Sequence, residues 1–145
     1  MTPPETSTAP IDLQVLEDAL QQVFAPWVRE LDLRLLQAGP GEVLLALPVA
    51  ARHVHAGGVL CGQTLMAACD SAMVLAVMTL LGSFKPMTTV QLQTSFLRPV
   101  PGDSGEARVT ARVLRKGGKL VFGEINVHTA AGELAAQATT TYMLL

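Results

Sequence analysis

The residue best suited to chemistry in this sequence is Asp70, which lies in a long apolar segment from Thr64 to Leu81. The positions that share a helical face with it are all apolar: Met66, Ala67, Met73 and Val74. Ionised carboxylates are seldom buried unless they are paired or functional. No Lys or Arg occurs from Gly57 to Gly82, which excludes a salt bridge within the segment. Asp70 is therefore either a catalytic group or a structural hydrogen-bond acceptor, for example toward its neighbour Ser71.

Gly62 is the second candidate, because it stands at the expected start of the same helix. The first backbone N–H groups of a helix have no intrahelical partner and carry the positive end of the helix dipole, so they can hold an oxyanion. Glycine also lets a substrate approach the backbone closely. The alternative is a glycine that only starts the helix.

The spacing of Gly62 and Asp70 predicts an assembly. Eight residues at about 1.5 Å each place them roughly 12 Å apart along a helix. An oxyanion donor and a carboxylate that act on one carbonyl group must both lie roughly 3 Å from it, so the two residues cannot share a substrate within one chain. Two antiparallel helices related by a two-fold axis would pair each Gly62 with Asp70 of the partner subunit. A shared site of this kind requires a homodimer.

Two histidines, His53 and His55, precede the Gly57-Gly58 pair. No cluster of Asp, Glu or Cys accompanies them, and two histidines alone do not make a closed metal site. We therefore expect no bound metal.

A basic turn is formed by Arg115, Lys116 and Lys119 around Gly117-Gly118. Such a turn either binds phosphate groups or is an ordinary solvated hairpin turn, since isolated surface charges need no further explanation. Arg98 has the same two interpretations.

The elements that must position these residues can be outlined from periodicity. Apolar residues at helical spacing predict an amphipathic helix over 11–24: Leu13, Leu16, Leu20 and Val23. Loose alternation over 28–36 and 42–48, around the turn at 39–41, predicts a hairpin. The apolar segment that carries Asp70 predicts one long central helix that ends at Gly82.

Four runs typical of strands follow this helix, over 87–97, 105–116, 120–129 and 134–144. In the second run apolar and polar residues alternate, as in a sheet with one buried and one solvated face. This order of elements indicates an α+β fold and not a parallel βαβ sheet. The antiparallel sheet must wrap the central helix, because nothing else in the chain can bury that helix all round. We expect a flexible tail over 1–10 and a single domain over 11–145.

Composition limits the partners and the cellular location. Of the 145 residues half are hydrophobic and only 4% aromatic, and the net charge of −2 offers no electrostatic footprint for nucleic acid. Cys61 and Cys69 cannot reach each other along one helix to form a disulfide, which indicates a reducing compartment. The first ten residues lack the features of a targeting signal. Because the carboxylate also disfavours a membrane span, we expect a cytoplasmic protein without a membrane partner.

Four motifs together resemble a known family. They are LCGQTLMAACDSAM at 60–73, TTVQLQTSFLRP at 88–99, LRKGGK at 114–119 and ATTTY at 138–142. Their order and spacing, over roughly residues 40–145, resemble the phenylacetate-degradation (PaaI-like) acyl-CoA thioesterases of the hotdog-fold superfamily. The sequence departs from that family at Cys61, where the family often has His, and at Gln63, where it has a second Gly.

The resemblance implies a hotdog fold with a five- or six-stranded antiparallel sheet around one helix. It also implies a homodimer or a tetramer built from two dimers, and hydrolysis of an acyl-CoA substrate without a cofactor. Four residues receive a catalytic role from it: Gly62 as oxyanion donor, Asp70 as general base or nucleophile, His55 as the group that orients water, and Thr89 as a hydroxyl near the acyl group.

Substrate contacts are implied for seven more residues: Gln63, Met66, Met73, Arg98, Arg115, Lys116 and Gly117. Val77 and Phe84 would complete an adaptable apolar acyl pocket, which does not distinguish aryl from alkyl chains.

Three other interpretations stay open. A hotdog hydratase or dehydratase would act on an enoyl thioester, with His55 and a carboxylate as its acid and base. A non-catalytic acyl-CoA binding protein would keep the groove without needing Asp70. Finally, Asp70 could be a purely structural hydrogen-bonding group.

Overall fold

The computed structural model describes residues 11–145, so the tail expected over 1–10 lies outside the described residues. The chain begins with α1 (Leu13–Gln22), which Asp12 caps by accepting a 2.9 Å hydrogen bond from the Gln14 N–H. A separate short helix, α2 (Pro26–Arg29), follows it. The amphipathic helix predicted from periodicity is confirmed, and α1 packs its buried face against the domain.

The central helix α3 (Gly62–Leu81) is buried along most of its length, as predicted. It ends at Gly82, whose backbone is left-handed (φ +83°) and whose N–H bonds the Met78 carbonyl oxygen at 2.9 Å. By length and composition α3 could cross a bilayer, but 72% of its most apolar window is buried inside the protein. The helix therefore has the burial expected of the core of a folded domain.

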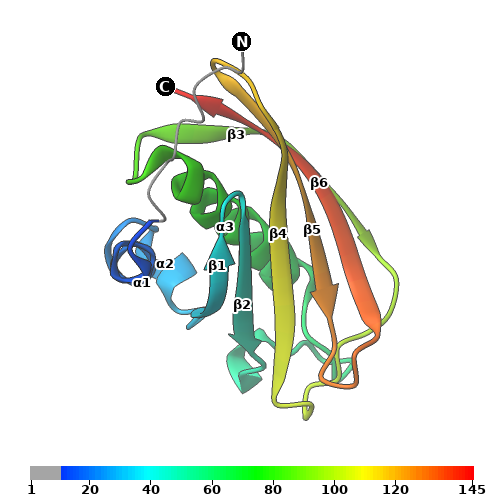
Figure 1. Ribbon diagram of the computed structural model, residues 1–145. Helices are drawn as coiled ribbons and strands as arrows, with labels where there is room; N and C mark the ends of the chain where they lie inside the picture. The colour runs from blue at the N-terminus through cyan, green and yellow to red at the C-terminus, as the bar shows by residue number, and fades with distance from the viewer. Residues whose placement is uncertain (1–10) are drawn as a thin grey trace.

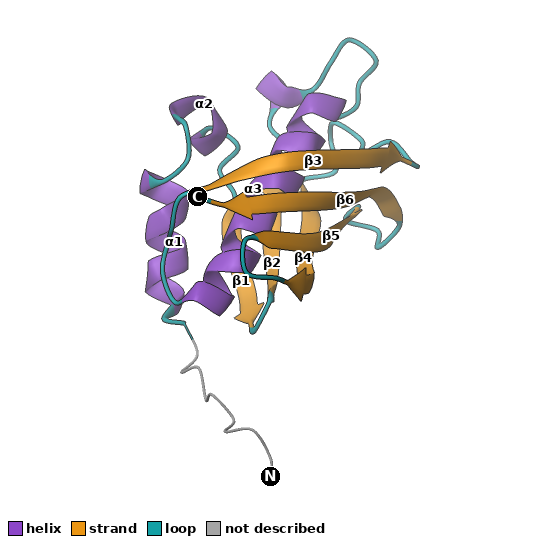
Figure 2. Cartoon of the chain, turned by 90° about the horizontal axis from the view of Figure 1, so that it is seen from above, coloured by secondary structure: helices purple, strands orange, loops and turns teal. Residues whose placement is uncertain are grey.

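Six antiparallel strands form one sheet in the order β1-β2-β4-β5-β6-β3. Their bounds are β1 (Arg34–Gly39), β2 (Glu42–Pro48), β3 (Met87–Phe96), β4 (Glu106–Lys116), β5 (Leu120–His128) and β6 (Leu134–Leu144). The sheet curves around α3, which lies against its inner face (Figures 1 and 2). This is the α+β hotdog architecture that the sequence predicts.

The first strand differs from the prediction over 28–36. The strand starts only at Arg34, because Pro26 begins the helical turn α2 and Asp32 adopts a left-handed backbone (φ +54°) before the chain extends. Proline is favoured at the first position of a helix, and its neighbours then continue that turn. The loop between β2 and α3 holds one further helical turn, η1 (Ala51–His53).

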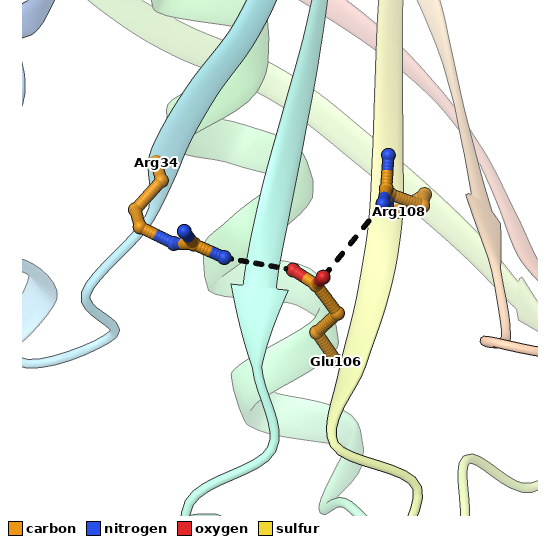
Figure 3. Close-up of polar contacts among 3 residues, drawn as sticks. All are labelled: Arg34, Glu106 and Arg108. Carbon is orange, nitrogen blue, oxygen red and sulfur yellow. Dashed lines mark hydrogen bonds and ion pairs between the residues drawn. The ribbon is translucent and has the colours of Figure 1, made fainter.

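The core lies between α3 and the inner faces of β2, β4 and β5. Met73 of α3 is fully buried, and its thioether fills the space left by Gly123 of β5, where an added Cβ would lie 2.6 Å from the Met73 sulfur. On the exposed side, Glu106 forms ion pairs with Arg34 at 3.0 Å and Arg108 at 3.7 Å (Figure 3). The first pair links β1 to β4, whereas the second lies within β4, and such exposed pairs add little stability.

Candidate active site

Asp70 lies near the middle of α3 and is only partly buried, with hydroxyl groups on one side. Its Oδ1 accepts a hydrogen bond from Thr89 Oγ1 at 2.8 Å and a second from the Tyr142 hydroxyl. The same hydroxyl also lies 2.8 Å from the backbone carbonyl oxygen of Asp70. Within residues 11–145 no hydrogen-bond partner is found for Oδ2. One carboxylate oxygen is thus held, and the other is free to meet water or a substrate.

Strand register brings these three residues together. Thr89 of β3 is paired with Tyr142 of β6, and the register shifts between Thr89 and Gln91, which marks a bulge in β3. Bulges redirect side chains and are frequent beside functional sites. Both hydroxyls reach the carboxylate of α3 although Tyr142 is 72 residues from Asp70 in sequence.

Tyr142 is a site residue that the sequence did not predict. The signal for it was present, since it occupies a buried position in β6 and a buried tyrosine hydroxyl needs a partner. Thr89 was expected near the acyl group, and the structure places its hydroxyl on Asp70. The suggested hydrogen bond between Ser71 and Asp70 was wrong, because the Ser71 hydroxyl donates to the Ala67 carbonyl oxygen at 2.8 Å.

Two acidic groups beside Asp70 are held in their neutral forms. Burial, followed by the Asp70 charge, raises the pKa of Cys69 from 9.0 to about 12. Burial and the same charge also raise the pKa of Tyr142 above its ordinary value. Both groups are therefore protonated at neutral pH, and the Tyr142 hydroxyl acts as a hydrogen-bond donor. Cys61 and Cys69 are both free thiols.

Gly62 is the first residue of α3, and Cys61 before it provides no side-chain cap. The Cys61 sulfur instead lies 3.0 Å from Thr64 Oγ1. The N–H groups of the first helical turn are left without intrahelical partners, as an oxyanion site requires. A Cβ added to Gly62 would lie 3.3 Å from Cζ of Phe96, so the Phe96 ring lies directly against this glycine.

A cleft of about 290 Å³ lies beside Gly62 at the end of β3. It brings together three of the predicted site residues, His55, Gly62 and Arg98. The complete lining is His55, Val59, Leu60, Gly62, Leu65, Phe96, Leu97, Arg98, Pro99 and Val100. Asp70 does not line this cleft, in agreement with the separation expected along one helix.

His55 lies in a tight loop before α3. Its Nδ1 accepts a hydrogen bond from the Gly57 N–H at 2.8 Å, which leaves the ring proton on Nε2 in the neutral form. The His55 ring lies against Gly57, where an added Cβ would lie 3.0 Å from Nδ1. The ring lines the cleft and can present Nε2–H as a donor.

The other predicted substrate contacts are spread more widely. Gln63 is exposed in the first turn of α3, whereas Met66 is half-buried and Met73 is fully buried against β5.

The pairing of Leu120 with Met143, and of Met87 with Leu144, places the β4–β5 turn at the end of the sheet where β3 begins.

Within one chain, the basic turn with Arg115, Lys116 and Gly117 is therefore at the end of the sheet opposite Gly62. Val77 is also buried, and Phe84 is exposed in the loop after α3. Among residues 11–145, no three His, Cys, Asp or Glu side chains gather as a metal site would need.

Comparisons with known proteins identify the family. A family model described as the thioesterase superfamily matches residues 57–136. A Saccharolobus solfataricus protein named "Putative esterase SSO2140" is 30% identical over 115 residues, which cover 79% of this chain and 80% of that protein.

Solved structures share the fold over most of the chain. The conserved protein PA5202 of Pseudomonas aeruginosa has a TM-score of 0.78 at 28% identity, covering 86% of this chain and 98% of its own. The Escherichia coli PaaI protein of the phenylacetic acid degradation operon has a TM-score of 0.79 at 16% identity, covering 92% of both chains. A Streptococcus pneumoniae hypothetical thioesterase protein, solved with coenzyme A, has a TM-score of 0.72 at 18% identity, covering 78% and 85%.

The matched family segment includes both Gly62 and Asp70, and the matched structures show the same sheet around one helix. The chain belongs to the thioesterase superfamily, in its hotdog fold.

Proposed function

We propose that this protein hydrolyses an acyl-CoA thioester to the free acid and CoA, at a site shared between the two chains of a homodimer. The observation that carries the proposal is the state of Asp70, a carboxylate on a buried helix with one oxygen held by two hydroxyls and the other free. Membership of the thioesterase superfamily supports thioester hydrolysis as the reaction class. The reaction needs only water and the side chains of the protein, and we propose that it takes place in the cytoplasm.

The edge strand β3 supports the dimer. Among residues 11–145 it pairs with β6 alone, so within this range its other edge has no strand partner, and Val90, Phe96 and Leu97 are exposed along or just beyond it. Stable proteins usually cover or protect such edges, because an unpaired strand edge can pair with other chains and cause aggregation. A second copy that adds its own β3 in antiparallel orientation would cover the backbone groups and the apolar side chains together.

This pairing would also assemble the site. Phe96 lies against Gly62, and Thr89 holds Asp70, so the two halves of the site stand at opposite ends of β3. A two-fold axis near Leu92 would bring Phe96 of one chain beside Thr89 of the partner subunit. Gly62 of one chain would then face Asp70 of the partner subunit, which meets the distance requirement that one helix cannot meet.

In this arrangement the thioester carbonyl oxygen accepts a hydrogen bond from the Gly62 N–H. Asp70 of the partner subunit then acts in one of two ways. As a general base it takes a proton from water, the water oxygen adds to the carbonyl carbon, and the C–S bond breaks while Asp70 passes the proton to the departing CoA sulfur. As a nucleophile it displaces CoA to form an acyl anhydride, which water then hydrolyses.

CoA recognition is assigned to the basic groups. Arg98 lines the Gly62 cleft, and the partner subunit's basic turn would approach the same end of the sheet in an antiparallel dimer. Arg and Lys side chains suit the phosphates of CoA. The matching S. pneumoniae fold was solved with coenzyme A, which supports this ligand class.

The experiment that tests the function is a thiol-release assay with short-chain, medium-chain and aryl acyl-CoAs, comparing the wild type with Asp70→Asn. We expect turnover of at least one substrate class and loss of that turnover in the variant, which keeps the shape and removes the charge. Undiminished hydrolysis by Asp70→Asn would end the assignment. Hydration of crotonyl-CoA would instead indicate a hydratase, and tight binding without turnover would indicate an acyl-CoA binding protein.

A further inference from the structure

Tyr142 is the chain's single tyrosine, and the proposed chemistry gives it no role. Its side chain is only 2% exposed, and it lies in β6 between Thr89 of β3 and Val121 of β5. Its hydroxyl points at α3, where it contacts both the carboxylate and the backbone carbonyl oxygen of Asp70. The hydroxyl therefore fixes the carboxylate relative to the helix backbone.

Tyr142 and Thr89 act on the same carboxylate oxygen from two different strands. Thr89 donates to Oδ1 at 2.8 Å, and Tyr142 donates to Oδ1 as well. A carboxylate held on one oxygen by two donors cannot rotate freely about its Cβ–Cγ bond. Its unheld oxygen, Oδ2, then points in one direction, which is what a general base or nucleophile needs.

Tyr142 is suited to holding the carboxylate and not to exchanging protons with it. Burial and the neighbouring Asp70 charge raise its pKa, so the hydroxyl keeps its proton across the working pH range. Its side chain is also almost completely buried, so a substrate at the surface cannot contact it. Tyr142 therefore has the properties of a residue that acts by orienting Asp70.

We propose that Tyr142 is a positioning residue which, together with Thr89, holds Oδ1 of Asp70 and thereby makes Oδ2 the oxygen that reacts. This inference rests on the proposed function, because it assigns the geometry of the same carboxylate. It differs from a purely structural role, in which the hydroxyl would only fasten β6 to α3.

Thr140 provides a matched control for that structural role. It lies two positions before Tyr142 in β6, is almost as buried, and donates its hydroxyl proton to the Gln91 carbonyl oxygen of β3 at 2.8 Å. It has no contact with Asp70 among its hydrogen bonds in residues 11–145. Removing either hydroxyl deletes one buried interaction of β6, but only Tyr142 touches the carboxylate.

The test compares Tyr142→Phe with Thr140→Val in the thiol-release assay, using the full-length protein and its best acyl-CoA. We expect kcat of Tyr142→Phe to fall roughly tenfold to a hundredfold while KM stays within about twofold. Thr140→Val should keep the wild-type kcat. Equal kcat values for Tyr142→Phe and the wild type, or equal losses in both variants, would overturn the proposal.

Thr89→Val provides a second test should Tyr142→Phe not fold, because Thr89 is exposed and its replacement is nearly isosteric. It removes the other donor, so we again expect a lower kcat at an unchanged KM, and a wild-type kcat would contradict the proposal. Asp70→Asn, assayed in parallel, separates the positioning role of Tyr142 from the proposed function. If Asp70→Asn is inactive while Tyr142→Phe and Thr89→Val are fully active, the positioning role fails and the proposed function stands. If Asp70→Asn is fully active, both fail.

Discussion

Gly62→Ala is expected to stabilise the protein while it damages the site. Gly62 has no positive φ, so alanine can adopt its backbone conformation. Alanine is favoured over glycine by about 1 kcal/mol in a helix interior, and we expect about half of that in the first turn of α3. For a chain of this length such a gain raises Tm by roughly 1–2 °C. The new Cβ would lie 3.3 Å from the Phe96 ring, which is half exposed and can move by the few tenths of an ångström required.

Activity should change in the opposite direction. In the proposed mechanism the thioester carbonyl oxygen accepts a hydrogen bond from the Gly62 N–H, and the added methyl group would crowd that approach. Loss of one oxyanion donor lowers kcat by about 10²–10³-fold in other enzymes, and we expect a loss of that order in the thiol-release assay.

Gly39→Ala is the matched control for Gly62→Ala. Gly39 also lacks a positive φ, and a Cβ added there meets nothing within 4 Å. It lies at the end of β1, away from the cleft. Wild-type turnover in Gly62→Ala would refute the oxyanion role. A Tm well below that of the Gly39→Ala control would refute the packing argument.

Three further predictions concern the core, alkaline stability and CoA binding. Gly123→Ala should lower the free energy of unfolding by about 1–3 kcal/mol in urea titrations, because the new Cβ meets the Met73 sulfur at 2.6 Å; an unchanged midpoint would contradict this packing. The pKa of Cys69 is raised from 9.0 to about 12, so the native state keeps a proton that the unfolded state loses. Stability should therefore fall as pH rises from about 9 toward 12, and fall less steeply in Cys69→Ala; parallel pH curves would oppose this. The double variant Arg115→Ala/Lys116→Ala should raise KM for acyl-CoA roughly threefold to tenfold at low salt and less at high salt, with kcat unchanged; a salt-independent KM would exclude a phosphate contact.

Most of the fold follows from patterns that are local in sequence. The central helix could be predicted because its apolar run is long, contains no proline and ends at Gly82, the residue best able to adopt the left-handed conformation found there. The last four strands could be predicted because apolar and polar residues alternate between clear turn signals. The start of β1 could not, since a short helical turn begins at Pro26 and Asp32 is left-handed, and the loose alternation over 28–36 signals neither feature.

The candidate site could be predicted only in part from local sequence patterns. Asp70 and Gly62 could be singled out because their residue types are unusual at their positions in one helix. The contact between Asp70 and Tyr142 could not, because it depends on the register of β3 with β6 and on the bulge after Thr89. Register is a property of two distant segments together, and a shift of one residue would turn the Tyr142 side chain to the other face of the sheet.

The central claim is that Gly62 of one chain and Asp70 of the partner subunit form one site, and subunit complementation tests it most directly. Asp70→Asn and Gly62→Ala are each expected to be nearly inactive alone. When they are mixed in equal amounts under conditions that exchange subunits, half of the dimers become heterodimers with one intact site each. About a quarter of the wild-type activity should then return. No recovery in mixtures proven to contain heterodimers would contradict the shared site.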